Sequence, residues 1–155
     1  MEIRMILALP RDELSIPVVR RICTSAMGVL GVDERCQHDL EVALTEACTN
    51  VLTHSGPGDD YEVAVSIDDA SCVIEVIDRG HGFDSASLGF SDAAPTAEQG
   101  RGIQLMRALV DHVSFASKPE AGTIVHLEKE LTWHDESPAQ RLARRAAGGV
   151  AEPSA

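Results

Sequence analysis

The stretch from residue 36 to residue 51 constrains the fold most, because its apolar residues fall at three- and four-residue steps. These residues are Cys36, Leu40, Ala43, Leu44, Ala47 and Val51. Such spacing predicts an amphipathic helix that starts after Asp33 and buries one face. The sequence Gly-Pro-Gly-Asp-Asp at residues 56–60 predicts the turn that ends it.

Apolar and polar residues alternate after this helix, which predicts the sheet on which the helix packs. Residues 61–67 and 72–77 have the pattern of a hairpin whose sheet is covered on one face. Further strands are expected at residues 2–9, 113–116 and 123–131, and further helices at 12–30 and 103–110. The sequence therefore predicts an α/β two-layer sandwich, with helices packed on one face of a mixed, mainly antiparallel sheet.

Length and composition indicate one folded domain. A chain of 155 residues, 44% of them hydrophobic, can bury a single core, and we expect that domain at residues 1–131. Residues 132–155 are rich in Ala, Arg, Gly, Ser and Pro, which predicts a flexible C-terminal tail. Four cysteines without CxxC spacing predict reduced, buried thiols of a cytosolic protein.

The formal charge of −12 disfavours direct binding of DNA or RNA, because such a surface repels phosphate backbones. It is compatible with a basic protein partner and equally with a surface that is acidic only for solubility. No secretion signal and no run of 18 apolar residues is present, so secretion and membrane insertion are disfavoured. A cytoplasmic location is the expectation.

Glu46 and Asn50 form the first candidate site, since residues four apart project from the same side of a helix. The carboxylate can accept a proton from water or a hydroxyl. The amide oxygen can hold a hard cation such as Mg²⁺. Taken alone, an exposed polar face with incidental spacing is the simpler interpretation of this pair, and His54 one turn later is an ordinary helix-end histidine.

Asp78 ends a strongly apolar strand and is followed by Gly80 and Gly82. Its carboxylate can accept a hydrogen bond from an exocyclic amine, which adenine has and guanine lacks at the equivalent position. The glycines let the backbone approach a base closely. On this segment alone, a tight turn with a solvated aspartate is about equally plausible.

Gly100, Arg101 and Gly102 open the predicted helix at residues 103–110, and a helix N-terminus with bare amides favours anions. The guanidinium of Arg101 can bind a phosphate in bidentate fashion. The chain has no GxxxxGK[ST] loop and no GxGxxG after its first strand, so phosphate binding would not follow those patterns. Residues 84–99 are rich in Ser, Ala, Asp, Gly and Pro and show little periodicity, which predicts a mobile loop. The hydroxyl of Thr123 could support Asp78 or a bridging water.

These motifs together resemble the ATPase superfamily shared by DNA gyrase, Hsp90, histidine kinases and MutL. Within it they are most similar to the bacterial anti-sigma factors that are also serine kinases. Residues 46–50 with His54 resemble the N box of that branch, residues 78–83 its first glycine box, and residues 100–106 its second. The resemblance covers residues 2–131.

The resemblance implies ATP and Mg²⁺ as cofactors and assigns a role to each motif. Glu46 would be the general base and Asn50 the Mg²⁺ ligand, while residues 84–99 would be the lid over ATP. The nucleotide itself would contact His54, Asp78, Gly80, Gly82, Gly100, Arg101, Gly102, Ile103 and Thr123. Asp78 would hold the adenine amine, with Thr123 beside it.

The same resemblance implies a protein that sequesters a sigma factor and phosphorylates a serine of an anti-anti-sigma (STAS) partner. It also suggests a homodimer. Two other functions remain open on the residues: an ATP-dependent binding module without efficient phosphotransfer, and a stand-alone histidine-kinase-type catalytic domain. Glu46 argues against the first, because a module that only binds ATP could discard the base. The second lacks a helix with a phosphoacceptor histidine.

Overall fold

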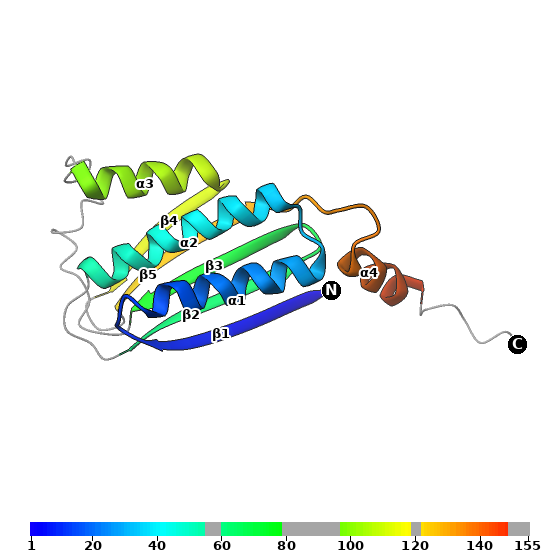
Figure 1. Ribbon diagram of the computed structural model, residues 1–155, viewed down its shortest axis with the longest axis horizontal. Helices are drawn as coiled ribbons and strands as arrows, with labels where there is room; N and C mark the ends of the chain where they lie inside the picture. The colour runs from blue at the N-terminus through cyan, green and yellow to red at the C-terminus, as the bar shows by residue number, and fades with distance from the viewer. Residues whose placement is uncertain (55–59, 79–96, 119–121, 149–155) are drawn as a thin grey trace, which may run out of the picture.

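Five strands form one sheet in the computed structural model, and three helices lie side by side on one of its faces (Figure 1). The structure describes residues 1–54, 60–78, 97–118 and 122–148. The strand order is β1-β2-β3-β5-β4, and all four pairings are antiparallel. The elements are β1 (Glu2–Pro10), α1 (Ser15–Leu30), α2 (Glu34–His54), β2 (Asp60–Asp68), β3 (Ser71–Asp78), α3 (Ala97–Leu109), β4 (His112–Lys118), β5 (Gly122–Glu130) and α4 (Pro138–Gly148). The predicted α/β two-layer sandwich is confirmed.

The core lies between the sheet and its helices, as the residue periodicities predict. All six residues of the apolar stripe on α2 are buried. The strands contribute every second residue, a pattern that is regular in β2 and β3. Because successive strand side chains point to opposite faces, this alternation shows that only one face of these strands is covered.

The turn between β2 and β3 sets the register that positions the site. The Asp68 carboxylate accepts hydrogen bonds from the backbone amides of Ser71 and Ala70, each at 2.7 Å. These bonds hold the pKa of Asp68 below its ordinary value. With the turn fixed, Tyr61 at the start of β2 lies opposite Asp78 at the end of β3. The ends of β1, α2 and β3 and the starts of α1, α3 and β5 therefore meet at one end of the molecule, at the left in Figure 1.

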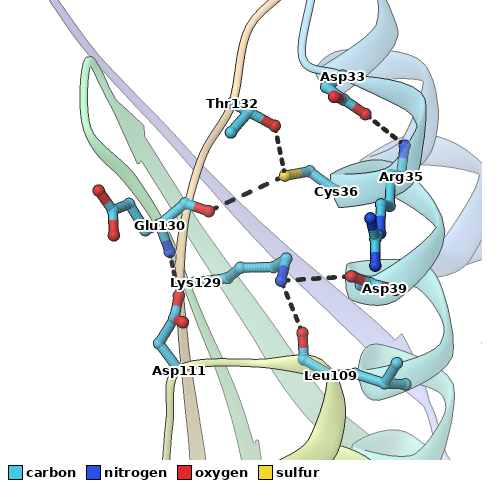
Figure 2. A network of polar contacts seen from close by, with 9 residues as sticks. All are labelled: Asp33, Arg35, Cys36, Asp39, Leu109, Asp111, Lys129, Glu130 and Thr132. Carbon is cyan, nitrogen blue, oxygen red and sulfur yellow. Dashed lines mark hydrogen bonds and ion pairs between the residues drawn. The ribbon is translucent and has the colours of Figure 1, made fainter.

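Lys129 of β5 fixes the far end of α3 (Figure 2). Its Nζ donates a hydrogen bond to the Leu109 carbonyl at 2.8 Å and pairs with the Asp39 carboxylate of α2 at 3.3 Å. A cation at a helix C-terminus interacts favourably with the helix dipole. Next to it, the Asp111 carboxylate accepts a hydrogen bond from the Glu130 amide at 2.6 Å. These contacts tie α3 to α2 and to the sheet.

Helix α3 begins at Ala97, earlier than the sequence predicted. Residues 97–99 were expected in the loop, and Gly100 to Gly102 were expected ahead of the helix; all of them are helical. The physical reason is that alanine, glutamate and glutamine at 97–99 are strong helix formers. The rest of the predicted loop, residues 84–96, lies outside the described residues.

Residues 132–148, which the sequence predicts to be part of a C-terminal tail, contact the domain and include a helix. Trp133 forms a bridge with Val32, and its Nε1 donates a hydrogen bond to the Asp69 carbonyl at 3.0 Å. Helix α4 follows, with the Ser137 hydroxyl accepting a hydrogen bond from the Gln140 amide at 3.2 Å. A serine N-cap followed by proline at the first helical position is a strong helix start.

The four cysteines are free and buried, in agreement with the predicted reduced thiols. Burial raises the pKa of Cys23 to about 11 and that of Cys72 to about 12. Within the described ranges, none of the helices is long and apolar enough to cross a membrane.

Candidate functional site

A row of buried polar side chains crosses the sheet where β2 starts, β3 ends and β5 starts. Tyr61, Asp78 and Thr123 are register partners on these adjacent strands. All three face the helices and are at most 2% exposed. Directly opposed residues of an antiparallel pair have Cβ atoms about 4.5–5.5 Å apart. The three side chains therefore form one contiguous polar surface beneath the helices.

Thr123 carries an unsatisfied group. Among buried side-chain oxygens and nitrogens in the described part of the chain, its Oγ1 alone has no hydrogen-bond partner. Buried polar groups are nearly always hydrogen-bonded, so an unpaired hydroxyl is available to a bound water or ligand. The hydroxyl lies across the strand pair from the Asp78 carboxylate. An acceptor and a free hydroxyl side by side fit a ligand with both donor and acceptor atoms, as a nucleobase has.

Arg11 provides the positive charge beside Asp78. Its Nη1 lies 3.4 Å from Asp78 Oδ2, and its Nη2 donates a hydrogen bond to the Val51 carbonyl of α2 at 3.2 Å. A buried carboxylate is stable only with a compensating charge or hydrogen bonds. Arg11 is not among the residues predicted from the sequence, because a single basic residue just after a strand forms no motif.

Tyr61 and Cys48 remain neutral beside this ion pair. The Ser15 hydroxyl lies 2.5 Å from the Tyr61 hydroxyl, which joins the start of α1 to the polar row. Burial raises the pKa of Tyr61 and that of Cys48 to about 12 each. Both groups therefore stay protonated near neutral pH and add hydrogen-bond donors to the site without adding negative charge.

Glu46 and Asn50 lie half-buried at the margin of the apolar stripe of α2. The Glu46 carboxylate packs against Gly102 of α3, where a Cβ atom would come within 2.9 Å of Glu46 Oε2. A glycine at this position therefore leaves room for the carboxylate. The contact brings the first and third sequence motifs together.

The other residues of the third motif have different environments. Gly100 and Ile103 are half-buried, and Ile103 packs against the core, whereas Arg101 is exposed. The two glycines are already inside α3, so their amides belong to the helix rather than to its open end. The predicted phosphate contacts of these residues stay a prediction.

The structure leaves the contacts of three predicted residues untested. His54 is the last residue of α2, while Gly80 and Gly82 lie outside the described residues. No group of three or more His, Cys, Asp or Glu side chains in the described ranges gathers as a metal site. Any divalent cation near Asn50 would need its other ligands from water or a bound ligand, as Mg²⁺ commonly has.

A hollow of about 500 Å³ adjoins the site on a neighbouring face of α2. Arg11, Pro17, Thr49 and Leu52 are among the residues that line it. The Thr49 hydroxyl donates a hydrogen bond to the Thr45 carbonyl within α2 at 2.8 Å. The hollow combines the aliphatic side chains of Ile16, Pro17 and Leu52 with three threonines and with the charged residues Arg11 and Glu13. The Arg11 side chain is shared between the hollow and the polar row.

Known proteins match most of this chain. A sequence model of the histidine kinase-like ATPase domain matches residues 9–129. An anti-sigma F factor of Pasteuria penetrans is 33% identical over 101 residues, which are 60% of this chain and 67% of that protein. A serine-protein kinase RsbW of Bacillus pumilus is 29% identical over 136 residues, which are 79% of this chain and 83% of that protein.

Solved structures share the fold. The crystal structure of the RsbU and RsbW domains of a Mycobacterium tuberculosis protein matches with a TM-score of 0.64 at 20% identity, covering 83% of this chain and 32% of that one. A histidine kinase domain from Erythrobacter litoralis matches with a TM-score of 0.51 at 16% identity, covering 79% of this chain and 62% of that one. This chain thus spans about a third of the first structure's length, and at these identities the likeness shows the fold alone.

Proposed function

This chain belongs to the histidine kinase-like ATPase family, in its branch of anti-sigma factors and serine-protein kinases, and we propose that it is an ATP-dependent anti-sigma factor. Its activity is phosphorylation of a serine on an anti-anti-sigma (STAS) partner, and its location is the cytoplasm, where sigma factors act. The observation that supports nucleotide binding is the buried Asp78 carboxylate beside the Thr123 hydroxyl, which has no hydrogen-bond partner.

Asp78 and Thr123 recognise the base. The carboxylate accepts a hydrogen bond from the adenine amine, and the Thr123 hydroxyl bonds the ring directly or through a water. Guanine presents an acceptor where adenine presents its amine, so the carboxylate disfavours it. Gly80 and Gly82 are proposed to line the base, in line with their place directly after β3.

Glu46 and Asn50 act at the phosphate end. When bound, ATP supplies the phosphoryl group and Mg²⁺ reduces its negative charge; positioning and charge compensation account for most of the catalysis in such transfers. Asn50 holds the cation through its amide oxygen. Glu46 accepts the proton of the serine hydroxyl, and Gly102 leaves its carboxylate room to do so.

A protein substrate needs a surface beside these groups. The hollow next to α2 supports this requirement, since it adjoins the site and combines aliphatic surface with hydroxyl and charged groups. The acidic chain suits partners with basic surfaces.

Phosphotransfer to STAS-type proteins encoded near this chain, followed by mass spectrometry, tests the proposal. Glu46→Gln keeps the shape of the side chain and leaves Asn50 in place. We expect near-normal ATP affinity, retained sigma-factor binding and transfer slowed at least about tenfold. Glu41→Gln is the matched control: it makes the same change on α2, at a residue whose contact is Arg20, 3.5 Å away.

The variants separate the kinase from a binding module. Asn50→Ala should lose the Mg²⁺-dependent part of ATP binding together with activity. Full transfer by Glu46→Gln would remove the general-base role. A wild-type chain that binds ATP and a sigma factor but yields no phosphoserine on any STAS partner would favour the module.

A further inference from the structure

We propose that Arg11 is a positioning residue of the base pocket, which holds the Asp78 carboxylate in the orientation that accepts the adenine amine. The inference rests on the proposed function, because it assumes that the base lies at Asp78. No motif of the sequence contains Arg11, and only its contacts identify it.

The geometry places Arg11 at the junction of three elements. It follows β1 directly, contacts the end of β3 through Asp78 at 3.4 Å, and contacts α2 through the Val51 carbonyl at 3.2 Å. The side chains of Arg11 and Asp78 are 9% and 2% exposed. A charge pair this deeply buried is weakly screened by water, so it holds a fixed arrangement.

The guanidinium suits this junction better than an ammonium would. Two nitrogens of one rigid plane meet two acceptors on different elements, and each acceptor fixes the direction of the other contact. Val51 is among the last four residues of α2, where the carbonyls form the negative end of the helix dipole. Arg11 therefore attaches the carboxylate that binds the base to the helix that carries Asn50.

Orientation matters because the adenine contact is a hydrogen bond to one carboxylate. Hydrogen bonds weaken steeply when the donor and acceptor are misaligned. Removing Arg11 takes one contact and the adjacent positive charge from this carboxylate, which changes the orientation that it prefers. The loss of binding affinity should then come from the contact with the adenine amine, while the contacts with ribose and phosphates stay unchanged.

A pair of ligands isolates that contact. ATP and purine riboside triphosphate differ only in the 6-amine of the base. We expect wild type to bind ATP about tenfold more tightly than the analogue, as a hydrogen bond to a charged acceptor gives. In Arg11→Met the ATP affinity should fall about tenfold while that of the analogue changes less than twofold, so the preference for the amine disappears.

The controls separate positioning from folding. Arg4→Met removes an exposed arginine of β1, paired with Glu2 at 2.8 Å, and should leave both affinities unchanged. If Arg11→Met does not fold, Arg11→Lys carries the test: it keeps a charge but cannot span both acceptors, and it should lose most of the preference for the amine. In the Asp78→Asn background, Arg11→Met should change ATP affinity less than twofold.

Each outcome bears on one assignment. Equal losses for ATP and the analogue in the Arg11 variants would overturn the positioning role, because a merely structural residue affects both ligands alike. An amine preference that survives in Arg11→Met or Arg11→Lys would overturn it too. A wild type that binds the two ligands equally would instead overturn the base contact of Asp78, which belongs to the proposed function.

Discussion

Replacing Gly102 with alanine should raise stability and lower activity at the same time. A Cβ at this position would lie 2.9 Å from Glu46 Oε2, against 3.4 Å for ordinary contact, so the carboxylate must move by about 0.5 Å. Because the obstructing atom is the end of a flexible side chain, the helix itself need not shift. The displaced atom is the one to which the proposed function assigns the proton of the serine hydroxyl.

The two effects have different magnitudes and different assays. Alanine in place of glycine inside a helix stabilises it by about 0.8–1.0 kcal/mol. Urea unfolding should therefore show a free energy of unfolding that is higher by up to that amount. Misplacing a reacting group by about 1 Å can cost about 100-fold in rate. For half that displacement we expect the rate of serine phosphorylation to fall about tenfold, with little change in sigma-factor binding.

Gly28→Ala is the matched control for this prediction. Gly28 lies in α1, and a Cβ there would meet the Gln37 side chain at an ordinary 3.7 Å. It should give a similar gain in stability with an unchanged phosphorylation rate. A Gly102→Ala protein that phosphorylates at the wild-type rate would refute the contact with Glu46 as a catalytic requirement. A loss of stability in that variant would show that the helix, not the carboxylate, gives way.

Three further changes test the structure. Gly31→Ala should destabilise the protein by at least about 1–2 kcal/mol in urea unfolding, since Gly31 has φ +88° and a Cβ would lie 2.5 Å from that of Ser137. Thr123→Val should stabilise by about 1–3 kcal/mol, because it removes an unpaired buried hydroxyl, yet weaken ATP binding in titration. A thiol reagent at pH 8 should modify the native protein far more slowly than the urea-unfolded chain, because all four cysteines are buried and burial also raises the pKa of Cys23, Cys48 and Cys72. Rapid labelling of the native protein would contradict the core.

Periodicity was enough to predict the layers of this fold. The stripe of α2 and the alternation of β2 and β3 are local patterns whose spacing matches one helix face or one sheet face. Element ends were predicted less well, as α3 shows. Its first turn follows from the helix propensity of residues 97–99. Gly100 and Gly102 had suggested a later start, because glycine disfavours a helix interior.

Contacts between distant segments could not be predicted from local patterns. Arg11 and Asp78 are brought together only by the sheet, and no spacing in the sequence relates them. Helix α4 is a different case, because Ser137-Pro138 is a local helix start that was available in the sequence. Its polar and alanine-rich composition concealed the signal, since only Ala139 of that helix is buried.

The polar row marks the site because it breaks the core pattern at one place. One row inward on the same face of β2, β3 and β5, the register partners are Val63, Val76 and Val125. Continuing that pattern would be cheaper for folding, since a buried carboxylate needs a counter-charge and an unpaired hydroxyl costs about 1–3 kcal/mol. Tyr61, Asp78 and Thr123 instead occupy the last such row, at the end of the sheet where α2 ends and α3 begins. This local loss of stability is the physical argument for placing the proposed nucleotide site at this end of the sheet.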